Sequence, residues 1–161
     1  MNSEMRTLCL VFPMNIEAAP FLERIEVRRE WSSGKARYRE VFFEGHHLLI
    51  AKCGVGPERA AACVRALHSR PAAILCVGTS GALVPELALH NLVISSETVN
   101  AAQPDQILPS SEFLVKRVAD AVTCEDLCHS IVRLATSNAA VFHRRQRELL
   151  HRSTVAHAVD M

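Results

Sequence analysis

The chain has 161 residues, a formal net charge of +1 and 49% hydrophobic residues. A chain of this length can bury its own core without disulfides or a structural metal. The near-zero net charge gives no electrostatic reason to expect nucleic acid or a membrane surface as a partner. No apolar run approaches the roughly 20 residues of a membrane-spanning helix. We therefore expect a single globular domain over residues 1–161 that contacts no membrane.

Six cysteines are spread along the chain, most of them in apolar runs. Cys76, inside the run from Ala72 to Val77, is an example. This placement is typical of buried, reduced thiols in a cytosolic protein. The first residues are polar, and the apolar run from Leu8 to Phe12 is too short for a signal peptide. We therefore expect a cytoplasmic location.

The first half of the chain predicts strands and helices in alternation. After an initial apolar run, Asn15 predicts the N-cap of a helix with Glu17 in its first turn, where the helix dipole favours a carboxylate. A hairpin follows, then a helix beginning at Pro57 and a further buried strand. In order, these elements are predicted at residues 7–12 (strand), 15–25 (helix), 37–43 and 47–53 (hairpin), 57–69 (helix) and 73–77 (strand).

The second half continues the alternation. In order, its elements are predicted at residues 92–96 (strand), 112–122 (helix), 131–136 (strand), 143–152 (helix) and 155–160 (strand). Residues 100–110 hold two prolines and predict a loop. Strands alternating with helices, without a linker, predict an α/β domain in three layers, with a central mixed sheet flanked by helices.

Glycine-bearing turns follow two of the predicted strands. Gly54-Val55-Gly56 and Gly78-Thr79-Ser80-Gly81 could present backbone N–H groups and a hydroxyl to a sugar or an anion. A turn of this kind on its own is more often structural than functional. A dinucleotide-binding fingerprint is excluded because its third glycine is absent. A P-loop is excluded because neither turn leads into Gly-Lys-Ser/Thr.

Four segments, in this order, resemble the nucleoside phosphorylase and nucleosidase superfamily, most closely its methylthioadenosine/S-adenosylhomocysteine nucleosidase branch. They are Phe12–Glu17, Lys52–Pro57, Val77–Ile94 and Ala158–Met161. The third, with Val77-Gly78-Thr79-Ser80-Gly81-Ala82-Leu83, is the most specific, and the others support it in combination. The resemblance covers nearly the whole chain and implies a phosphorylase/hydrolase-like fold.

The resemblance implies hydrolysis of the N-glycosidic bond of a purine nucleoside. The implied substrate is a 5′-modified adenosine such as methylthioadenosine or S-adenosylhomocysteine, and adenine is released. Glu17 matches the carboxylate that acts as base on the attacking water. The implied substrate-binding residues are Gly54, Thr79, Ser80, Gly81, Val141, Phe142 and Met161. The resemblance also implies a homodimer, with no cofactor and no metal.

Three of these matches carry further detail. Val141 and Phe142 fall near the segment that packs on the purine, and they can equally be read as ordinary core residues. Met161 matches a methionine that lies against the ribose.

In the family, a ribose-binding glutamate follows the methionine that Met161 matches, and a purine-protonating aspartate lies on a later strand and loop. Both lie outside this sequence, together with the last strand and helices of the fold. A general acid contributes typically ~10²–10⁴ in rate, so we expect this chain alone to be weakly active or inactive.

Hydrolysis and phosphorolysis differ in the residues that bind phosphate. Phosphorylases resembling this chain carry an arginine just before the signature loop, at the position of Cys76. A thiol cannot bind phosphate as a guanidinium does. The first loop, Phe12–Asn15, also lacks the family's phosphate-binding glycine and arginine. Hydrolysis is therefore favoured over phosphorolysis.

Departures from the nucleosidase branch keep other readings open. Asn91 stands where an aspartate is usual, and residues 98–103 lack the branch's histidine-aspartate pattern. A phosphate-dependent phosphorylase, including the hopanoid-associated type, and a futalosine-hydrolase-like member stay open. So does a remnant that binds a nucleoside without turnover.

Two polar clusters favour simpler interpretations. Cys124, Cys128 and His129 cannot all face one side of a helix, and no second ligand pair lies at zinc-finger spacing. A metal site is therefore not expected. The basic segment from His143 to Arg152 has no accompanying aromatic platform for stacking bases, so it is read as a solvated helix face and not as a nucleic-acid site.

Overall fold

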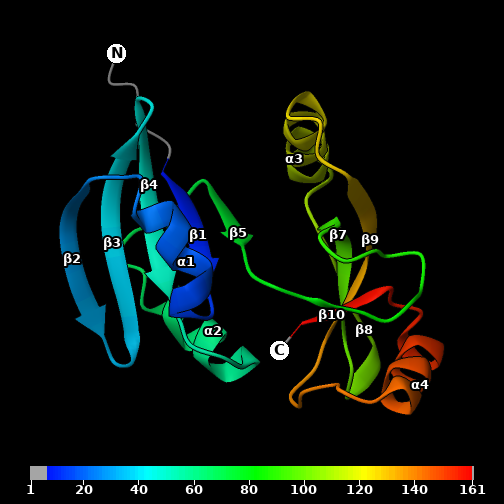
Figure 1. The fold of residues 1–161 in the computed structure, drawn as a ribbon. Helices are drawn as coiled ribbons and strands as arrows, with labels where there is room; N and C mark the ends of the chain where they lie inside the picture. Colours follow the sequence, from blue (N-terminus) through cyan, green and yellow to red (C-terminus); the bar gives the residue numbers. More distant parts are fainter. Residues whose placement is uncertain (1–6, 161) are drawn as a thin grey trace. The chain divides into compact units, whose positions relative to one another are not determined.

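The computed structural model describes residues 7–160. The chain divides into two compact units, with the boundary between Thr79 and Ser80. Each unit has its own sheet and its own core (Figure 1). No helix of the described residues is long and apolar enough to cross a membrane.

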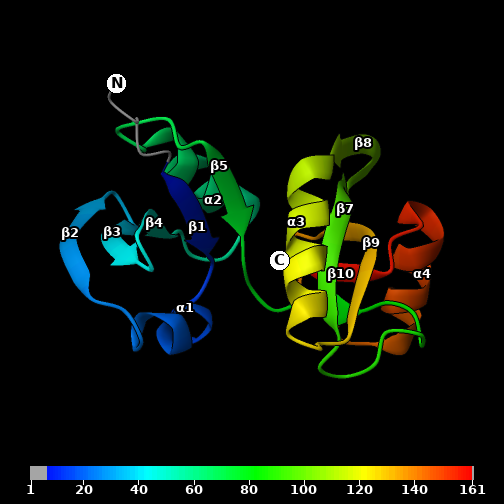
Figure 2. The same cartoon turned by 90° about the horizontal axis from the view of Figure 1, so that it is seen from above.

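The N-terminal unit is a five-stranded mixed sheet in the order β2-β3-β4-β1-β5. Its strands β4, β1 and β5 run parallel, whereas β2 and β3 continue the sheet antiparallel. Figure 2 shows α1 and α2 on opposite sides of this sheet. The elements are β1 (Leu8–Phe12), α1 (Asn15–Leu22), β2 (Val27–Ser33), β3 (Ala36–Phe43), β4 (His46–Lys52), α2 (Pro57–Arg65) and β5 (Ala73–Cys76).

The two faces of this sheet have separate cores. Because successive side chains of a strand point to opposite faces, β1 contributes Val11 to one core and Phe12 to the other. On the α1 face, Phe12 packs with Ala18 of the helix and with Ile50 of β4. On the other face, Cys63 of α2 packs in the core that includes Val11. Burial on both faces explains why β1 is a continuous apolar run and not an alternating one.

The C-terminal unit is also a five-stranded mixed sheet, in the order β6-β10-β9-β7-β8. Strands β10, β9 and β7 are parallel, and β6 and β8 are antiparallel at the two edges. Figure 2 shows α3 and α4 on opposite sides of this sheet. Its core includes Val99, Ala135 and Val159, one from each parallel strand. The elements are β6 (Gly81–Ala82), β7 (Leu92–Asn100), β8 (Gln103–Pro109), α3 (Glu112–Cys124), β9 (His129–Thr136), α4 (Arg144–Thr154) and β10 (Ala158–Asp160).

The predicted α/β fold with mixed sheet flanked by helices is confirmed, with the strands divided between two sheets. The prediction of a loop at residues 100–110 is wrong, because strand β8 occupies most of this range. Its prolines, Pro104 and Pro109, are tolerated because β8 is an edge strand that pairs only with β7. The edge strand β2 was not predicted, because six of its seven residues are exposed and the apolar pattern is weak.

The expectation that the cysteines are buried holds for only half of them. Cys9, Cys53 and Cys63 are buried, whereas Cys76, Cys124 and Cys128 are exposed. Cys76 is exposed because β5 is the edge strand of its sheet and its burial pattern alternates. Burial raises the pKa of the Cys9 and Cys53 thiols to about 11, so both stay protonated near neutral pH.

Candidate active site

The carboxylate of Glu17 accepts hydrogen bonds from two separate segments of the N-terminal unit. Its Oε1 accepts hydrogen bonds from the backbone N–H of Thr79 at 2.8 Å and from the Thr79 hydroxyl at 2.9 Å. Its Oε2 accepts one from the backbone N–H of Met14 at 2.9 Å. Two residues that the sequence analysis assigned to the site, Glu17 and Thr79, are therefore in direct contact although 62 positions separate them.

The start of α1 fixes one side of this contact. Met14 is the N-cap, with an extended backbone, and Asn15 is the first helical residue. The prediction of Asn15 as the cap is therefore wrong by one position. Glu17 is the third residue of the helix, from which a glutamate side chain reaches back to the N–H of the cap residue. This bond satisfies a donor that the first turn of a helix leaves unpaired.

The parallel pairing of β1 with β5 fixes the other side. Val11 is in register with Cys76, and the N–H of Val77 donates to the carbonyl of Val11 at 2.9 Å. The chain segments that follow β1 and β5 therefore both begin at the carboxyl ends of these strands, on the same side of the unit. This pairing brings the loop at Thr79 to the start of α1, at the carboxyl ends of parallel strands, where ligands of open α/β sheets bind.

Gly78 makes the approach of the carboxylate possible. A Cβ atom at this position would lie 2.9 Å from Glu17 Oε1, closer than such contacts occur. The backbone φ of Gly78 is not in the left-handed region, so a larger residue here would act through space, by displacing the Glu17 carboxylate. From the sequence, Gly78 was interpreted only as part of a turn that could present N–H groups to a ligand, and this spatial role was not recognised.

The three donors leave Glu17 with some unused acceptor capacity. A carboxylate offers about four lone-pair positions, and three are taken by Met14 and Thr79. Glu17 is only partly buried and Thr79 is exposed, so the site lies near the surface of the unit. A carboxylate held in this way can accept a hydrogen bond from water and take its proton.

Gly54 lies after β4, in the same unit, and its φ of +84° is in the left-handed region that favours glycine. A Cβ atom there would also lie 3.0 Å from the side chain of Arg59. These facts explain the glycine structurally, and its role in binding substrate stays a prediction.

The remaining predicted site residues belong to the C-terminal unit or lie beyond the described residues. Gly81 opens β6 and pairs with Val159 of β10. Val141 packs against the core of that unit, as the core interpretation predicted, whereas Phe142 is 77% exposed. Ser80 is exposed, and Met161 lies outside the described residues.

Asp160, at the end of β10, is a partly buried acid that was not assigned to the site from the sequence. Its Oδ1 is buried without a hydrogen-bond partner among the described residues. Burial raises the pKa of this carboxyl, and a hydrogen bond with Thr136 offsets part of the rise. Its backbone carbonyl accepts a hydrogen bond from the N–H of Ser137 at 2.9 Å, which ties the end of β10 to the end of β9.

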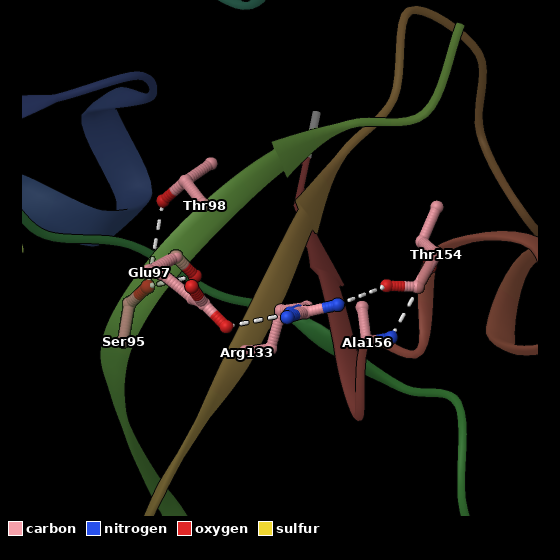
Figure 3. Close-up of polar contacts among 6 residues, drawn as sticks. All are labelled: Ser95, Glu97, Thr98, Arg133, Thr154 and Ala156. Carbon is pink, nitrogen blue, oxygen red and sulfur yellow. Dashed lines mark hydrogen bonds and ion pairs between the residues drawn. The ribbon is translucent and has the colours of Figure 1, made fainter. Parts of the chain in front are cut away.

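Arg133 of β9 links strand β7 to the end of α4 (Figure 3). Its Nε donates to Glu97 Oε1 of β7 at 2.7 Å, and its Nη1 donates to the carbonyl of Thr154, the last residue of α4, at 3.0 Å. The Thr154 hydroxyl in turn accepts from the N–H of Ala156 at 3.2 Å. Arg133 therefore holds the turn from α4 into β10 against the sheet.

A metal centre is not supported by the arrangement of side chains. Within residues 7–160, no group of three or more His, Cys, Asp or Glu side chains is placed to hold an ion. Cys124 and Cys128 are exposed on and after α3, and His129 begins β9.

A family model described as "Phosphorylase superfamily" matches residues 7–161. The chain belongs to the phosphorylase superfamily. The resemblance seen in the sequence is thereby confirmed at the level of the superfamily. Among curated protein sequences, none matches the chain significantly.

Solved nucleosidases share the fold. The 5′-methylthioadenosine/S-adenosylhomocysteine nucleosidase from Helicobacter pylori has a TM-score of 0.91 at 17% identity, over 99% of this chain and 76% of that one. Futalosine hydrolase of H. pylori has a TM-score of 0.89 at 17% identity, over 98% and 75%. The 5′-methylthioadenosine/S-adenosylhomocysteine nucleosidase from Neisseria meningitidis has a TM-score of 0.86 at 19% identity, over 97% and 75%. At these identities, the likeness establishes the fold alone.

Proposed function

We propose that this member of the phosphorylase superfamily is a nucleosidase, which hydrolyses the N-glycosidic bond of a purine nucleoside. The observation that carries the proposal is the contact between Glu17 and Thr79. The contact fixes a carboxylate at the carboxyl ends of β1 and β5 with one acceptor position left for water.

In this reaction Glu17 acts as the general base. A water molecule donates a hydrogen bond to the free lone pair of the carboxylate and attacks C1′ of the sugar. The water oxygen bonds to C1′, the bond from C1′ to the purine nitrogen breaks, and Glu17 takes the proton of the water. The departing purine carries the bonding electron pair and takes a proton from solvent, and Glu17 releases its proton to solvent, so a free sugar and a neutral purine leave.

The same contacts favour hydrolysis over phosphorolysis. A loop that binds phosphate needs free N–H and hydroxyl donors, but the N–H and the hydroxyl of Thr79 are both directed at Glu17. The negative carboxylate in this place repels a phosphate dianion. Cys76, just before the loop, offers no guanidinium to offset that repulsion.

The proposed substrate is a 5′-modified adenosine such as methylthioadenosine or S-adenosylhomocysteine, and adenine is the proposed product. The fold shared with the solved nucleosidases supports this choice, and the similar score of futalosine hydrolase makes futalosine the second substrate to assay. In this proposal the enzyme is a cytoplasmic homodimer without cofactor. Substrate contacts come from Gly54, Thr79, Ser80, Gly81, Val141, Phe142 and Met161.

Phosphate dependence tests the proposal. The 161-residue protein is incubated with 5′-methylthioadenosine, with and without inorganic phosphate, and the adenine and the sugar product are identified by chromatography. We expect slow release of adenine and a free sugar at a rate that does not change with phosphate. A sugar 1-phosphate that forms only in the presence of phosphate would establish a phosphorylase. Tight nucleoside binding without any product would favour a binding protein.

A further inference from the structure

Basic side chains gather around a small cavity between α1 and the hairpin of β3 and β4. Arg37 and Arg39 of β3, Lys52 of β4 and Asn15 of α1 supply its polar lining. The remaining lining is apolar and comes from α1 and β4. No acidic side chain lines the cavity, so every charged group in its lining is a cation.

The strand register places two of these cations directly opposite each other. Arg37 pairs with Lys52 across the antiparallel hairpin, and Arg39 pairs with Ile50 two positions further along. Residues in register, and residues two positions apart on one strand, lie on the same face of a sheet. Like charges directly opposite each other on two strands destabilise the pairing. The arrangement therefore has an energetic cost that an anion in the cavity would offset.

Among residues 7–160, an ion pair involves only one of these three cations. Glu30 of β2 accepts a hydrogen bond from Arg39 at 3.2 Å, in a pair whose side chains are 29% and 44% exposed. Elsewhere in residues 7–160, ion pairs join Arg133 to Glu97 and Arg144 to Glu148, and none reaches Arg37 or Lys52. Two cations of the cavity, one of them partly buried, are therefore available to a ligand.

We propose that this cavity binds a small oxyanion of the phosphate or sulfate class, with Arg37 and Lys52 as its main ligands. A guanidinium offers two parallel N–H donors that match two oxygens of an oxyanion, and an ammonium adds a mobile point charge. The cavity measures about 20 Å³, which is room for about one water-sized group. One oxygen of the anion enters it, and the other oxygens lie at the mouth between the two cations.

This site is separate in chemistry from the proposed hydrolysis. Glu17 directs its carboxylate at Met14 and Thr79, and neither of these residues lines the cavity. The oxyanion is a bound ligand that bridges α1 and the hairpin, and it takes no part in bond cleavage. The proposal therefore holds or fails independently of any nucleosidase activity.

The test is a titration of the whole chain with inorganic phosphate at constant ionic strength, maintained with sodium chloride. Binding is followed by two-dimensional ¹H–¹⁵N NMR and by calorimetry. We expect saturable binding, with shifts concentrated at the amides of Asn15, Arg37 and Lys52. Sulfate should compete, because it presents the same tetrahedral oxygens, and the Arg37→Gln and Lys52→Gln variants should each bind phosphate at least tenfold more weakly.

A matched control separates a site from general charge screening. Arg29→Gln removes the same charge from the same sheet, but the Arg29 guanidinium lies 5.3 Å from the Trp31 ring and does not line the cavity. We expect this variant to bind phosphate within twofold of the parent chain. Binding that does not saturate, or an equal loss of affinity in Arg29→Gln and Arg37→Gln, would overturn the proposal.

Thermal unfolding provides a second readout that does not depend on measuring affinity. Without phosphate, Lys52→Gln should unfold at the same temperature as the parent chain or higher, since a like-charge pair has been removed. With phosphate, the parent chain should gain thermal stability and Lys52→Gln should not. Equal gains in both proteins would contradict the assignment of Lys52 as a ligand.

Discussion

Glu17 and Thr79 meet through two hydrogen bonds to one carboxylate oxygen, at 2.8 Å from the backbone N–H and 2.9 Å from the hydroxyl of Thr79. The contact joins the first turn of α1 to the loop after β5, so it depends on the parallel pairing of β1 and β5. A general base that activates a water molecule must be held in a fixed orientation, and these hydrogen bonds fix the orientation of the Glu17 carboxylate.

The hydroxyl of Thr79 can be tested apart from its backbone. Thr79→Val keeps the N–H donor and a similar shape but removes the hydroxyl bond to Glu17. A hydrogen bond to a charged group contributes about 1.5–3 kcal/mol, so we expect roughly ten- to hundredfold slower adenine release. Thr79→Ser restores the hydroxyl and should recover most of the rate. If Thr79→Val retains the parent rate, the hydroxyl does not position Glu17.

Gly78 is predicted to act only through Glu17. In Gly78→Ala, the new Cβ would lie 2.9 Å from Glu17 Oε1, so the carboxylate must move away from Thr79. A displacement of about 1 Å in a catalytic group costs on the order of 10² in rate. The double variant with Glu17→Gln provides the control, because Gly78→Ala should have no further effect once the carboxylate is gone. An additive loss in the double variant would assign Gly78 a separate role.

Asp160 should make stability depend on pH. Burial raises the pKa of this carboxyl in the folded chain, so between its ordinary and raised values the folded state holds a proton that the unfolded state has released. The free energy of unfolding therefore falls as pH rises through that window. In Asp160→Asn, the loss of stability between pH 4 and pH 7, measured by urea unfolding, should be smaller than in the parent chain. Asp120→Asn, on an exposed part of α3, is the control, and an equal effect of the two substitutions would refute this account.

The Arg133 linkage should contribute more to stability than a surface ion pair. Arg133→Met leaves Glu97 partly buried without its partner and frees the carbonyl of Thr154, at an expected cost of about 1–2 kcal/mol. Arg144→Met removes an i,i+4 pair with Glu148 in which Arg144 is 88% exposed. Its expected cost is about 0.3–0.5 kcal/mol. Equal losses in urea unfolding would show that the linkage to α4 adds nothing.

The sequence predicted features that depend on local order along the chain. Continuous apolar runs identified the strands β1 and β5, and the family resemblance identified Glu17, in the first turn of α1, as a candidate base. The polar edge strands were less predictable. Both β2 and β8 are mostly exposed, and β8 also carries prolines that only an edge position tolerates.

Features that depend on contacts between distant segments could not be read from the sequence. Nothing local to Gly78 indicates that a carboxylate lies against it, because that contact follows from the pairing of β1 and β5. The burial of the Asp160 Oδ1 atom without a hydrogen-bond partner among the described residues likewise depends on the pairing of β10 with β9. The pairing of two positive charges, Arg37 opposite Lys52, follows from the register of β3 and β4 and cannot be read from the sequence.

The most direct test of the central claim compares the parent chain with Glu17→Gln in the release of adenine from 5′-methylthioadenosine without phosphate. Glutamine keeps the size and one acceptor oxygen of Glu17 but cannot take a proton from water. A positioned general base contributes about 10²–10⁴ in rate, so we predict slow release by the parent chain and at least a hundredfold slower release by the variant. Equal, measurable rates of release in the two proteins would contradict the assignment of Glu17 as the base of a nucleosidase.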